Sequence, residues 1–370
     1  MKLGRTLRFL DCEMNKKMNI EAPNDSILQK DIDRIAQELV KFPEINHKTI
    51  FVTGASGLLG SLTVKSLLCL NRCYRFKVSV VALVRSLEKA QAAFGDLMHD
   101  DKLRIIVGDI GEIPDIVEPI DYIIHGASVT SSRDFVEHPV ETIFTAINGT
   151  NQVLELARSK NISGMVYISS LEMYGTINSD IPVSEDAGGY IDPLSIRSSY
   201  SESKRMAENL CCAFSSEYGL PVKIARLTQT FGPGVSYNDN RVFAQFARSV
   251  IKKKNIVLHT KGSTVRNYCY TSDAIRALFY ILLKGTTGSA YNVANMGTGI
   301  SIRDMAELAA KFGSHTNIVF ERGDNEKRGY NPPVTICLDT SRLQALGWSA
   351  EVGLEEMFQN LIKSMESSLI

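Results

Sequence analysis

The chain of 370 residues carries 41 basic and 41 acidic side chains, and its composition is 44% hydrophobic and 22% charged. This length and composition are typical of a globular protein with two subdomains, and they argue against disorder. Balanced charge supplies no overall positive field. We therefore expect neither a nucleic-acid nor a membrane partner, and we predict a small-molecule ligand instead.

The chain shows no pattern of a secretion signal or a membrane span. Charges run through residues 1–19, and no stretch of about 18 uncharged apolar residues occurs anywhere. The seven cysteines are odd in number and lack paired C-x-x-C spacing, which favours buried thiols over disulfides or a zinc site. We therefore expect a cytoplasmic protein without a bound metal.

Residues 1–48 precede the first strong strand and contain one amphipathic segment. Apolar side chains recur near helical spacing across residues 25–42, after a capping Asp25 or Ser26. We predict a helical extension that either docks on the main domain or contacts another subunit. We expect no chemical role for it.

From residue 49 the chain alternates apolar strands with helix-length segments. The predicted strands are 49–54, 78–84, 103–110, 122–127, 164–170 and 222–227. This alternation predicts the α/β class, with a Rossmann-type doubly wound parallel sheet over residues 49–227.

The alternation loosens after residue 227 into shorter elements, with a helix predicted from Val242 to Lys252. We predict that residues 228–370 form mainly a smaller C-terminal substrate-binding domain. Some of its segments are expected to return to the first domain.

A glycine-rich segment links the first predicted strand to the following helix. Its three glycines have the spacing G-x-x-G-x-x-G, which lets the backbone approach a pyrophosphate at the positive end of that helix. A glycine-rich turn of another α/β protein is the alternative, but the strand-then-helix context favours a dinucleotide. The predicted cofactor contacts here are Gly54, Ser56, Gly57, Leu58, Leu59 and Gly60.

The second and third predicted strands bear on which dinucleotide binds. An acidic residue that would bind the ribose of NAD is expected after the second strand, but Arg85 stands there. Arg85 could accommodate the 2′-phosphate of NADP, or it could be a solvated charge that stacks on the adenine. Asp109 could meet the adenine or cap a helix. Ile110, Ala127, Tyr200 and Lys204 complete the predicted cofactor contacts.

Tyr200 and Lys204 are four residues apart, which places them on one face of a helix. A nearby ammonium favours the phenolate, so Tyr200 could take a proton from a sugar hydroxyl while hydride leaves the carbon. The fifth predicted strand ends at Ser170, which supplies a hydroxyl partner. The spacing Y-x-x-x-K is common by chance, so its position after this strand gives it weight.

These motifs together resemble the extended short-chain dehydrogenase/reductase family, also called the NAD-dependent epimerase/dehydratase family. TGASGLLG, HGAS, SSLEMYG, YSESK and FGPG stand in the expected order between residues 49 and 350. The resemblance implies that Ser170, Tyr200 and Lys204 are the catalytic hydroxyl, base and lysine. It also favours NAD over NADP, and we expect a homodimer.

Within the family, the chain resembles the UDP-glucuronate decarboxylase branch most. The segment SEDAGGYIDPLSIRSSYSESKRMAENLCCAF carries this resemblance, together with TFGPG, NDNRVFAQF and GSTVRNYCYTSD. It implies a redox-neutral lyase that acts on a nucleotide sugar through a C4-keto intermediate, with Glu172 near C5 of the sugar. Arg197, Gln229, Arg241 and Arg266 are then the expected substrate contacts. Glu172 could instead be a surface carboxylate, and Arg266 could pair with Asp273.

Several departures from the family pattern leave other reactions open. Gln229 stands where an asparagine is usual, and Leu171 stands where some 4,6-dehydratases place an acid that leucine cannot replace. A 4,6-dehydratase or a 4-epimerase is therefore an alternative. An NADPH-dependent reductase, which Arg85 would suit, and a non-catalytic dinucleotide-binding regulator are further alternatives.

Overall fold

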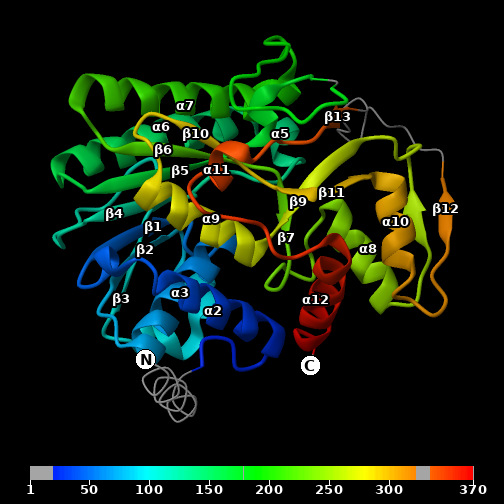
Figure 1. Ribbon diagram of the computed structural model, residues 1–370, viewed down its shortest axis with the longest axis horizontal. Coiled ribbons are helices and arrows are strands. Elements are labelled where there is room, and N and C mark those ends of the chain that lie inside the picture. Colours follow the sequence, from blue (N-terminus) through cyan, green and yellow to red (C-terminus); the bar gives the residue numbers. More distant parts are fainter. Residues whose placement is uncertain (1–19, 178, 322–333, 370) are drawn as a thin grey trace.

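The computed structural model describes residues 20–177, 179–321 and 334–369, and a seven-stranded sheet forms the centre of its larger part (Figure 1). Every neighbouring pair of strands in this sheet is parallel. The strands in spatial order are β10 (Ala290–Val293), β6 (Val222–Leu227), β5 (Gly164–Ser170), β4 (Tyr122–His125), β1 (Thr49–Thr53), β2 (Ser79–Val84) and β3 (Leu103–Val107). The strand order reverses between β1 and β4, so the predicted doubly wound fold is confirmed.

Helices cover both faces of the sheet, and each face has its own hydrophobic core (Figure 1). Alternate residues of a strand point to opposite faces. In β1, Ile50 and Val52 join one core, whereas Phe51 joins the other. The first core includes α3 (Leu58–Tyr74), α4 (Leu87–Phe94), α9 (Thr271–Lys284) and α11 (Ser341–Gln344). The second includes α6 (Pro139–Ser159) and α7 (Ser199–Tyr218).

Shorter elements lie in the connections between these strands and helices. They are η1 (Pro43–Ile45), η2 (Gly95–His99), α5 (Asp134–Glu137), η3 (Leu171–Tyr174) and η4 (Ile196–Ser198). Of these, α5, η3 and η4 follow β4 or β5 at the carboxyl end of the sheet or precede α7. They therefore lie where side chains can reach a site at that end of the sheet.

The C-terminal part of the chain forms a smaller part of the molecule with its own core. Its strands are β7 (Gln229–Phe231), β8 (Ile256–Leu258), β9 (Val265–Tyr270), β11 (Asn295–Ser301), β12 (Ile318–Phe320) and β13 (Thr335–Ile336). Its helices are α8 (Val242–Ile251), α10 (Ile302–Ala310) and α12 (Leu354–Ser367). The predicted helix at Val242 is therefore confirmed, while β10 and α9 lie beyond residue 227 and pack in the larger part. The exact domain boundaries stay a prediction.

The N-terminal extension forms α2 (Ser26–Leu39), as its periodicity predicts. The Asp25 carboxylate caps the helix by accepting from the backbone N–H groups of Ile27 and Leu28, at 3.1 and 2.9 Å. The helix packs on α3, α9 and α12. It therefore docks on the main body of this chain, which was one of the two predicted placements.

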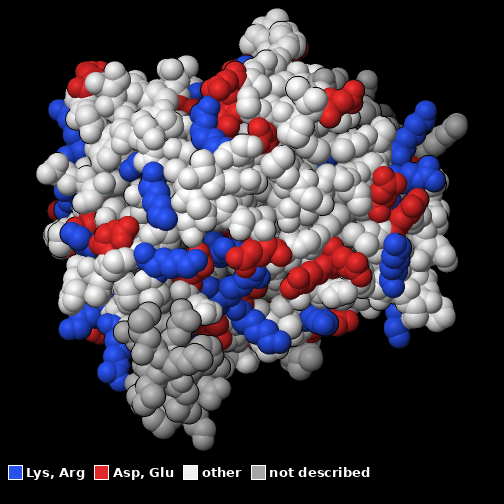
Figure 2. Space-filling view, viewed as in Figure 1, with Lys and Arg blue, Asp and Glu red and all other residues white. Residues whose placement is uncertain are grey.

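Charges on the face shown in Figure 2 are of both signs and are interspersed. In the described residues, no helix has both the length and the hydrophobicity to cross a membrane. No disulfide joins the described cysteines, which are Cys69, Cys73, Cys211, Cys212, Cys269 and Cys337. Cys12 lies outside the described residues.

Asp31 is a buried carboxyl group between the extension and the rest of the protein. Burial raises its pKa from 3.8 to about 7, although a hydrogen bond with Tyr270 and the charge of Arg34 oppose this rise. Asp273 and Asp25 add to the rise through their negative charge. The folded protein therefore holds a proton on Asp31 between about pH 4 and pH 7 that the unfolded chain has lost.

Replacing Asp31 by asparagine should stabilise the protein at alkaline pH. Stability that depends on the protonated carboxyl is complete below pH 3.8 and is lost as the pH rises through 7. Asp31→Asn removes this loss, so we expect a gain on the order of 2–4 kcal/mol in the free energy of unfolding at pH 8. Urea unfolding should show a smaller gain at pH 5. The exposed Asp101→Asn is the control, and an equal effect of Asp31→Asn at both pH values would contradict the assignment.

Candidate active site

A cavity of about 460 Å³ lies at the carboxyl ends of the parallel strands. Thr53, Val84, Ser170 and Leu227, which end β1, β2, β5 and β6, all line it. Ligands bind at this end of open α/β sheets because the strand order reverses there and leaves a crevice. The smaller C-terminal part closes the other side of the cavity through Arg241 and Arg266.

The glycine-rich segment forms one wall of the cavity, and two of its glycines are required by geometry. Gly54 has a φ of +66°, and a Cβ there would lie 2.9 Å from the Ala127 nitrogen. A Cβ on Gly60 would overlap the carbonyl oxygen of Gly54. The helix α3 begins at Leu58 with no side-chain cap, so its first N–H groups can receive a phosphate.

Nearly all predicted cofactor residues line this cavity, namely Gly54, Ser56, Gly57, Leu58, Leu59, Gly60, Arg85, Asp109, Ile110, Ala127 and Tyr200. Arg85 is exposed at the end of β2, and Lys89 lines the cavity beside it. Asp109 accepts from the Gly111 N–H at 2.8 Å and stabilises a turn, so it does not cap a helix as its alternative predicted. The structure therefore brings these residues together, while their contacts with a cofactor stay predictions.

Ser170 and Tyr200 meet inside the cavity. Ser170 ends β5, Tyr200 lies in the first turn of α7, and their hydroxyl groups are hydrogen-bonded. Lys204 lies behind the phenol: its Nζ donates to the Ile168 carbonyl at 2.9 Å and is 5.7 Å from the centre of the Tyr200 ring. Tyr200 and Lys204 therefore lie on one face of α7, as their spacing predicts. Lys204 is not among the described residues that line the cavity.

Burial is the largest influence on the pKa values of Tyr200 and Lys204. It raises the pKa of Tyr200 above its ordinary value, and the charge of Glu172 acts in the same direction. The hydrogen bond from Ser170 opposes both effects. Burial also lowers the pKa of Lys204, to about 8, although the charge of Glu208 raises it. A buried lysine with this pKa can exchange protons near neutral pH.

The predicted substrate residues divide into two groups. Gln229, Arg241 and Arg266 line the cavity, as Glu172 does. Arg197 is not among the described lining residues and instead donates to both oxygens of Glu172, at 3.0 and 3.3 Å. Glu172 is therefore not a free surface carboxylate.

Arg266 does not form the ion pair that we considered as its alternative. Asp273 pairs with Arg276 at 2.9 Å and accepts from the backbone N–H groups of Glu351 and Val352. The Nε of Arg266 is buried and has no hydrogen-bond partner within the described part of the chain. A buried donor without a partner that faces a cavity is suited to bind an anionic ligand.

Sequence reasoning missed several residues that shape the site. Phe135 of α5 stacks on Tyr200 with ring centres 4.2 Å apart and planes 9° apart. Glu208 and Arg226 form a buried ion pair at 2.7 Å beside β5. The position of Glu208, four residues after Lys204, is a signal that could have placed it on the same helix face. Nothing in the sequence around Phe135 indicates its contact.

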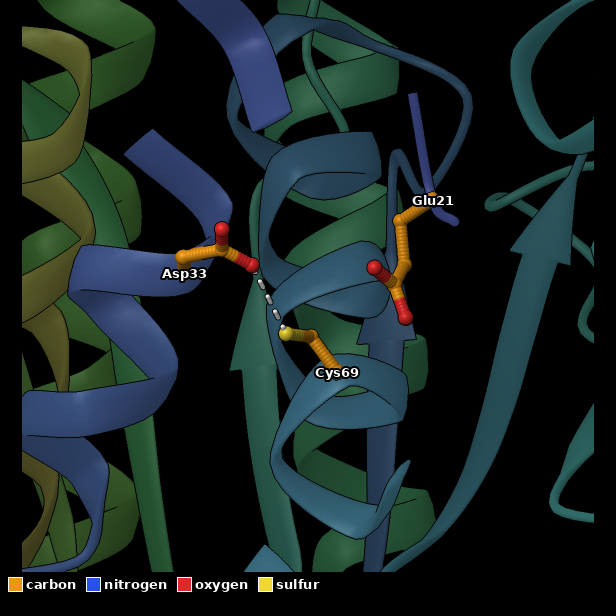
Figure 3. Close-up of side chains that lie close together, drawn as sticks. All are labelled: Glu21, Asp33 and Cys69. Atoms are coloured by element: carbon orange, nitrogen blue, oxygen red, sulfur yellow. Dashed lines mark hydrogen bonds between the residues drawn. The ribbon is translucent and has the colours of Figure 1, made fainter. Parts of the chain in front are cut away.

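Glu21, Asp33 and Cys69 form the described cluster with the spacing of a metal site, with ligand atoms within 4.8 Å of one another (Figure 3). The cluster already contains a cation, because Arg72 donates to both oxygens of Glu21 at 2.8 and 2.7 Å. A hydrogen bond with Cys73 and burial raise the pKa of the Cys69 thiol far above its usual range. These residues therefore fit a structural link between the extension and α3 better than a metal centre.

The comparison with protein families agrees with this architecture. Residues 50–294 match the model of the NAD dependent epimerase/dehydratase family. This match covers more than half of the chain, so the protein belongs to that family.

Individual relatives are more distant. The chain is 28% identical to UDP-glucuronic acid decarboxylase 6 of Arabidopsis thaliana over 85% of its own length and 88% of the relative. It is 28% identical to UDP-glucuronic acid decarboxylase 1 of Xenopus tropicalis, over 89% of this chain and 75% of the relative. The crystal structure of UDP-glucuronic acid 4-epimerase from Bacillus cereus in complex with NAD superposes with a TM-score of 0.71, at 22% identity, over 87% of this chain and 100% of that chain. This last similarity establishes the shared fold.

Gly60→Ala should weaken NAD binding, because the new methyl group displaces the Gly54 carbonyl and distorts the loop that is expected to hold the pyrophosphate. We expect the dissociation constant for NAD, measured by calorimetry, to rise about tenfold or more. Gly188→Ala is the matched control, since nothing lies within 4 Å of a Cβ there. An unchanged dissociation constant in Gly60→Ala would show that the loop does not hold the cofactor.

Proposed function

We propose that this protein uses NAD to convert a nucleotide sugar through a C4-keto intermediate, and that its reaction is the decarboxylation of UDP-glucuronate. One observation carries the proposal: a single cavity joins the glycine-rich loop to Ser170, Glu172 and Tyr200, and to Arg241 and Arg266 of the smaller C-terminal part. The relatives named UDP-glucuronic acid decarboxylase support the choice of substrate.

The glycine-rich wall fits the dinucleotide. Gly54 and Gly60 leave no room for side chains, and the start of α3 offers free N–H groups for a pyrophosphate. NAD held there would supply reversible hydride transfer at C4 of the sugar. Arg85 and Lys89 give the adenosine end a positive surface, so dissociation constants for NAD and NADP should be compared directly.

Tyr200 would carry the proton at C4. Its phenolate takes the proton of the C4 hydroxyl as the hydride leaves, and its phenol returns that proton when the ketone is reduced. Ser170 holds the phenol by a hydrogen bond, and Lys204 places a positive charge behind the ring. The positive charge compensates in part for the cost of ionising a buried phenol.

Loss of carbon dioxide follows from the C4 ketone. The ketone is β to the C6 carboxylate, so the C5–C6 bond breaks and its electron pair enters the C4 enolate. A proton is then added at C5. Glu172 lines the cavity and is the acidic group that we assign to this end of the sugar. Arg241 and Arg266 would hold the diphosphate.

Leu171 argues against a dehydratase of the kind that uses an acid at this position. It lines the cavity and is 5% exposed, and its side chain cannot protonate a leaving C6 hydroxyl. The lack of a disulfide among the described cysteines supports our expectation of a reducing, cytoplasmic location.

Product analysis tests the proposal. The protein is incubated with NAD and a panel of UDP-, dTDP-, GDP- and CDP-sugars, and the products are followed by mass spectrometry. We expect carbon dioxide and a UDP-pentose from UDP-glucuronate, whereas a 4-keto-6-deoxy sugar or an inverted C4 would assign dehydration or epimerisation.

Tyr200→Phe should reduce turnover by roughly 10² to 10⁴ while NAD binding is retained.

Glu172→Gln should separate oxidation from loss of carbon dioxide. The variant lacks the carboxylate near C5 but keeps the groups that act at C4, so we expect decarboxylation to slow by roughly 10² or more. Reduced cofactor or a 4-keto sugar should accumulate in single-turnover absorbance traces. Normal turnover without this accumulation would make Glu172 a bystander.

We also propose that the protein is a homodimer that associates through α6 and α7. The two helices pack together, and next to them lie α5 and η4. This surface exposes large apolar side chains, which are Val136, Val140, Phe144, Leu194, Ile196 and Met206. Such a group of exposed apolar side chains is typical of a protein interface.

Phe144→Asp should disrupt this association. Phe144 is 55% exposed, and burying a charge at an apolar interface is unfavourable. Light scattering coupled to gel filtration should show a dimer for the parent protein and a monomer for the variant. Phe320→Asp is the matched control, because Phe320 is 54% exposed and lies on β12 of the smaller part. A monomeric parent protein would refute the dimer.

A further inference from the structure

Glu172 is held in place by an arginine that does not line the cavity itself. Arg197, in η4, donates to both carboxylate oxygens, and the Ser201 hydroxyl lies 3.5 Å from one of them. The two paired side chains are only 19% and 18% exposed. Both hydrogen bonds come from the Nη2 atom of Arg197, and together with the Ser201 contact and the low exposure they restrict rotation of the carboxylate.

The same guanidinium is connected to the catalytic tyrosine through an aromatic ring. Arg197 lies over Phe135 at 4.9 Å from its centre, and Phe135 stacks on Tyr200 at 4.2 Å. Phe135 is 2% exposed, so this stack has little room to move. A planar guanidinium suits this position because it can stack on a ring while it donates in its own plane.

The charges of Glu172 and Arg197 also affect the ionisation of Tyr200. The negative charge of Glu172 raises the pKa of Tyr200, whereas the positive charge of Arg197 lowers it. The two effects oppose each other at the phenol. Without Arg197, only Arg241 of the named charges would oppose Glu172, and ionising Tyr200 in this buried site would become less favourable.

From these contacts we infer that Arg197 is a positioning residue: it fixes the Glu172 carboxylate in the cavity and balances its charge beside Tyr200. This inference rests on the proposed function. It differs from the sequence-based expectation that Arg197 binds the substrate. A substrate-binding arginine would affect mainly KM, whereas a residue that acts through Glu172 affects the chemical step.

A double-mutant cycle tests the inference with the full-length protein, NAD and UDP-glucuronate. Arg197→Met should lower kcat for release of carbon dioxide by roughly 10², with KM changed less than about threefold. Combining it with Glu172→Gln should give a kcat within about threefold of Glu172→Gln alone, because the partner is already gone. Arg197→Lys keeps the charge without the planar fork and should recover part of kcat.

The remaining outcomes distinguish failure of the inference from failure of the proposed function. Multiplicative losses in the double variant, or a large rise in KM with kcat retained, would overturn the inference. A parent protein that converts none of the sugars would overturn the proposed function instead. Arg133→Met is the matched control, since Arg133 is 77% exposed and pairs with Glu137 at the surface. Should Arg197→Met fail to fold, Arg197→Lys and Arg197→Gln complete the same cycle.

Discussion

The buried ion pair between Arg226 and Glu208 is the contact on which the site depends. Arg226 lies in β6 and Glu208 lies in α7, one helical turn after Lys204. Glu208 also accepts from Ser169 at 2.5 Å, next to Ser170 at the edge of the cavity. The pair therefore joins the end of β5 and the helix α7, which carry Ser170 and Tyr200. Loss of either partner from such a buried pair typically costs about 3–5 kcal/mol, because the other charge is left uncompensated.

Arg226 also connects the ion pair to the segments around the cavity. It donates to the Tyr174 hydroxyl at 3.0 Å, and Tyr174 donates to Asn292 of β10 at 2.7 Å. Asn292 in turn donates to the carbonyl groups of Val183 and Asp339. A satisfied network of this kind leaves few alternative arrangements for η3. Glu172 also lies in η3. The network fixes the end of this element at Tyr174, and Arg197 fixes the Glu172 side chain.

The N-terminal extension supports the other wall of the cavity. Asp25 accepts from Ser364 of α12, and Ser364 accepts from the Gly234 N–H at 3.1 Å. Leu28 of α2 and Leu58 of the glycine-rich wall both approach Gly234, with atoms 3.6 and 3.5 Å from the place of a Cβ there. The extension thus connects the start of α3 with the smaller core. Its helix was predictable from periodicity, whereas these contacts were not.

The sequence by itself determined the elements and the residue pairs that lie close along the chain. Strand and helix periodicity specified the α/β class, glycine spacing specified the loop, and the spacing of Tyr200 and Lys204 specified one helix face, because backbone geometry alone sets these relations. Only the tertiary structure decided which charges meet. It paired Asp273 with Arg276 and left Arg266 to the cavity, and it placed Arg197 on Glu172. Strand order and packing decide such partners, since several arginines could satisfy each carboxylate until the fold sets the distances.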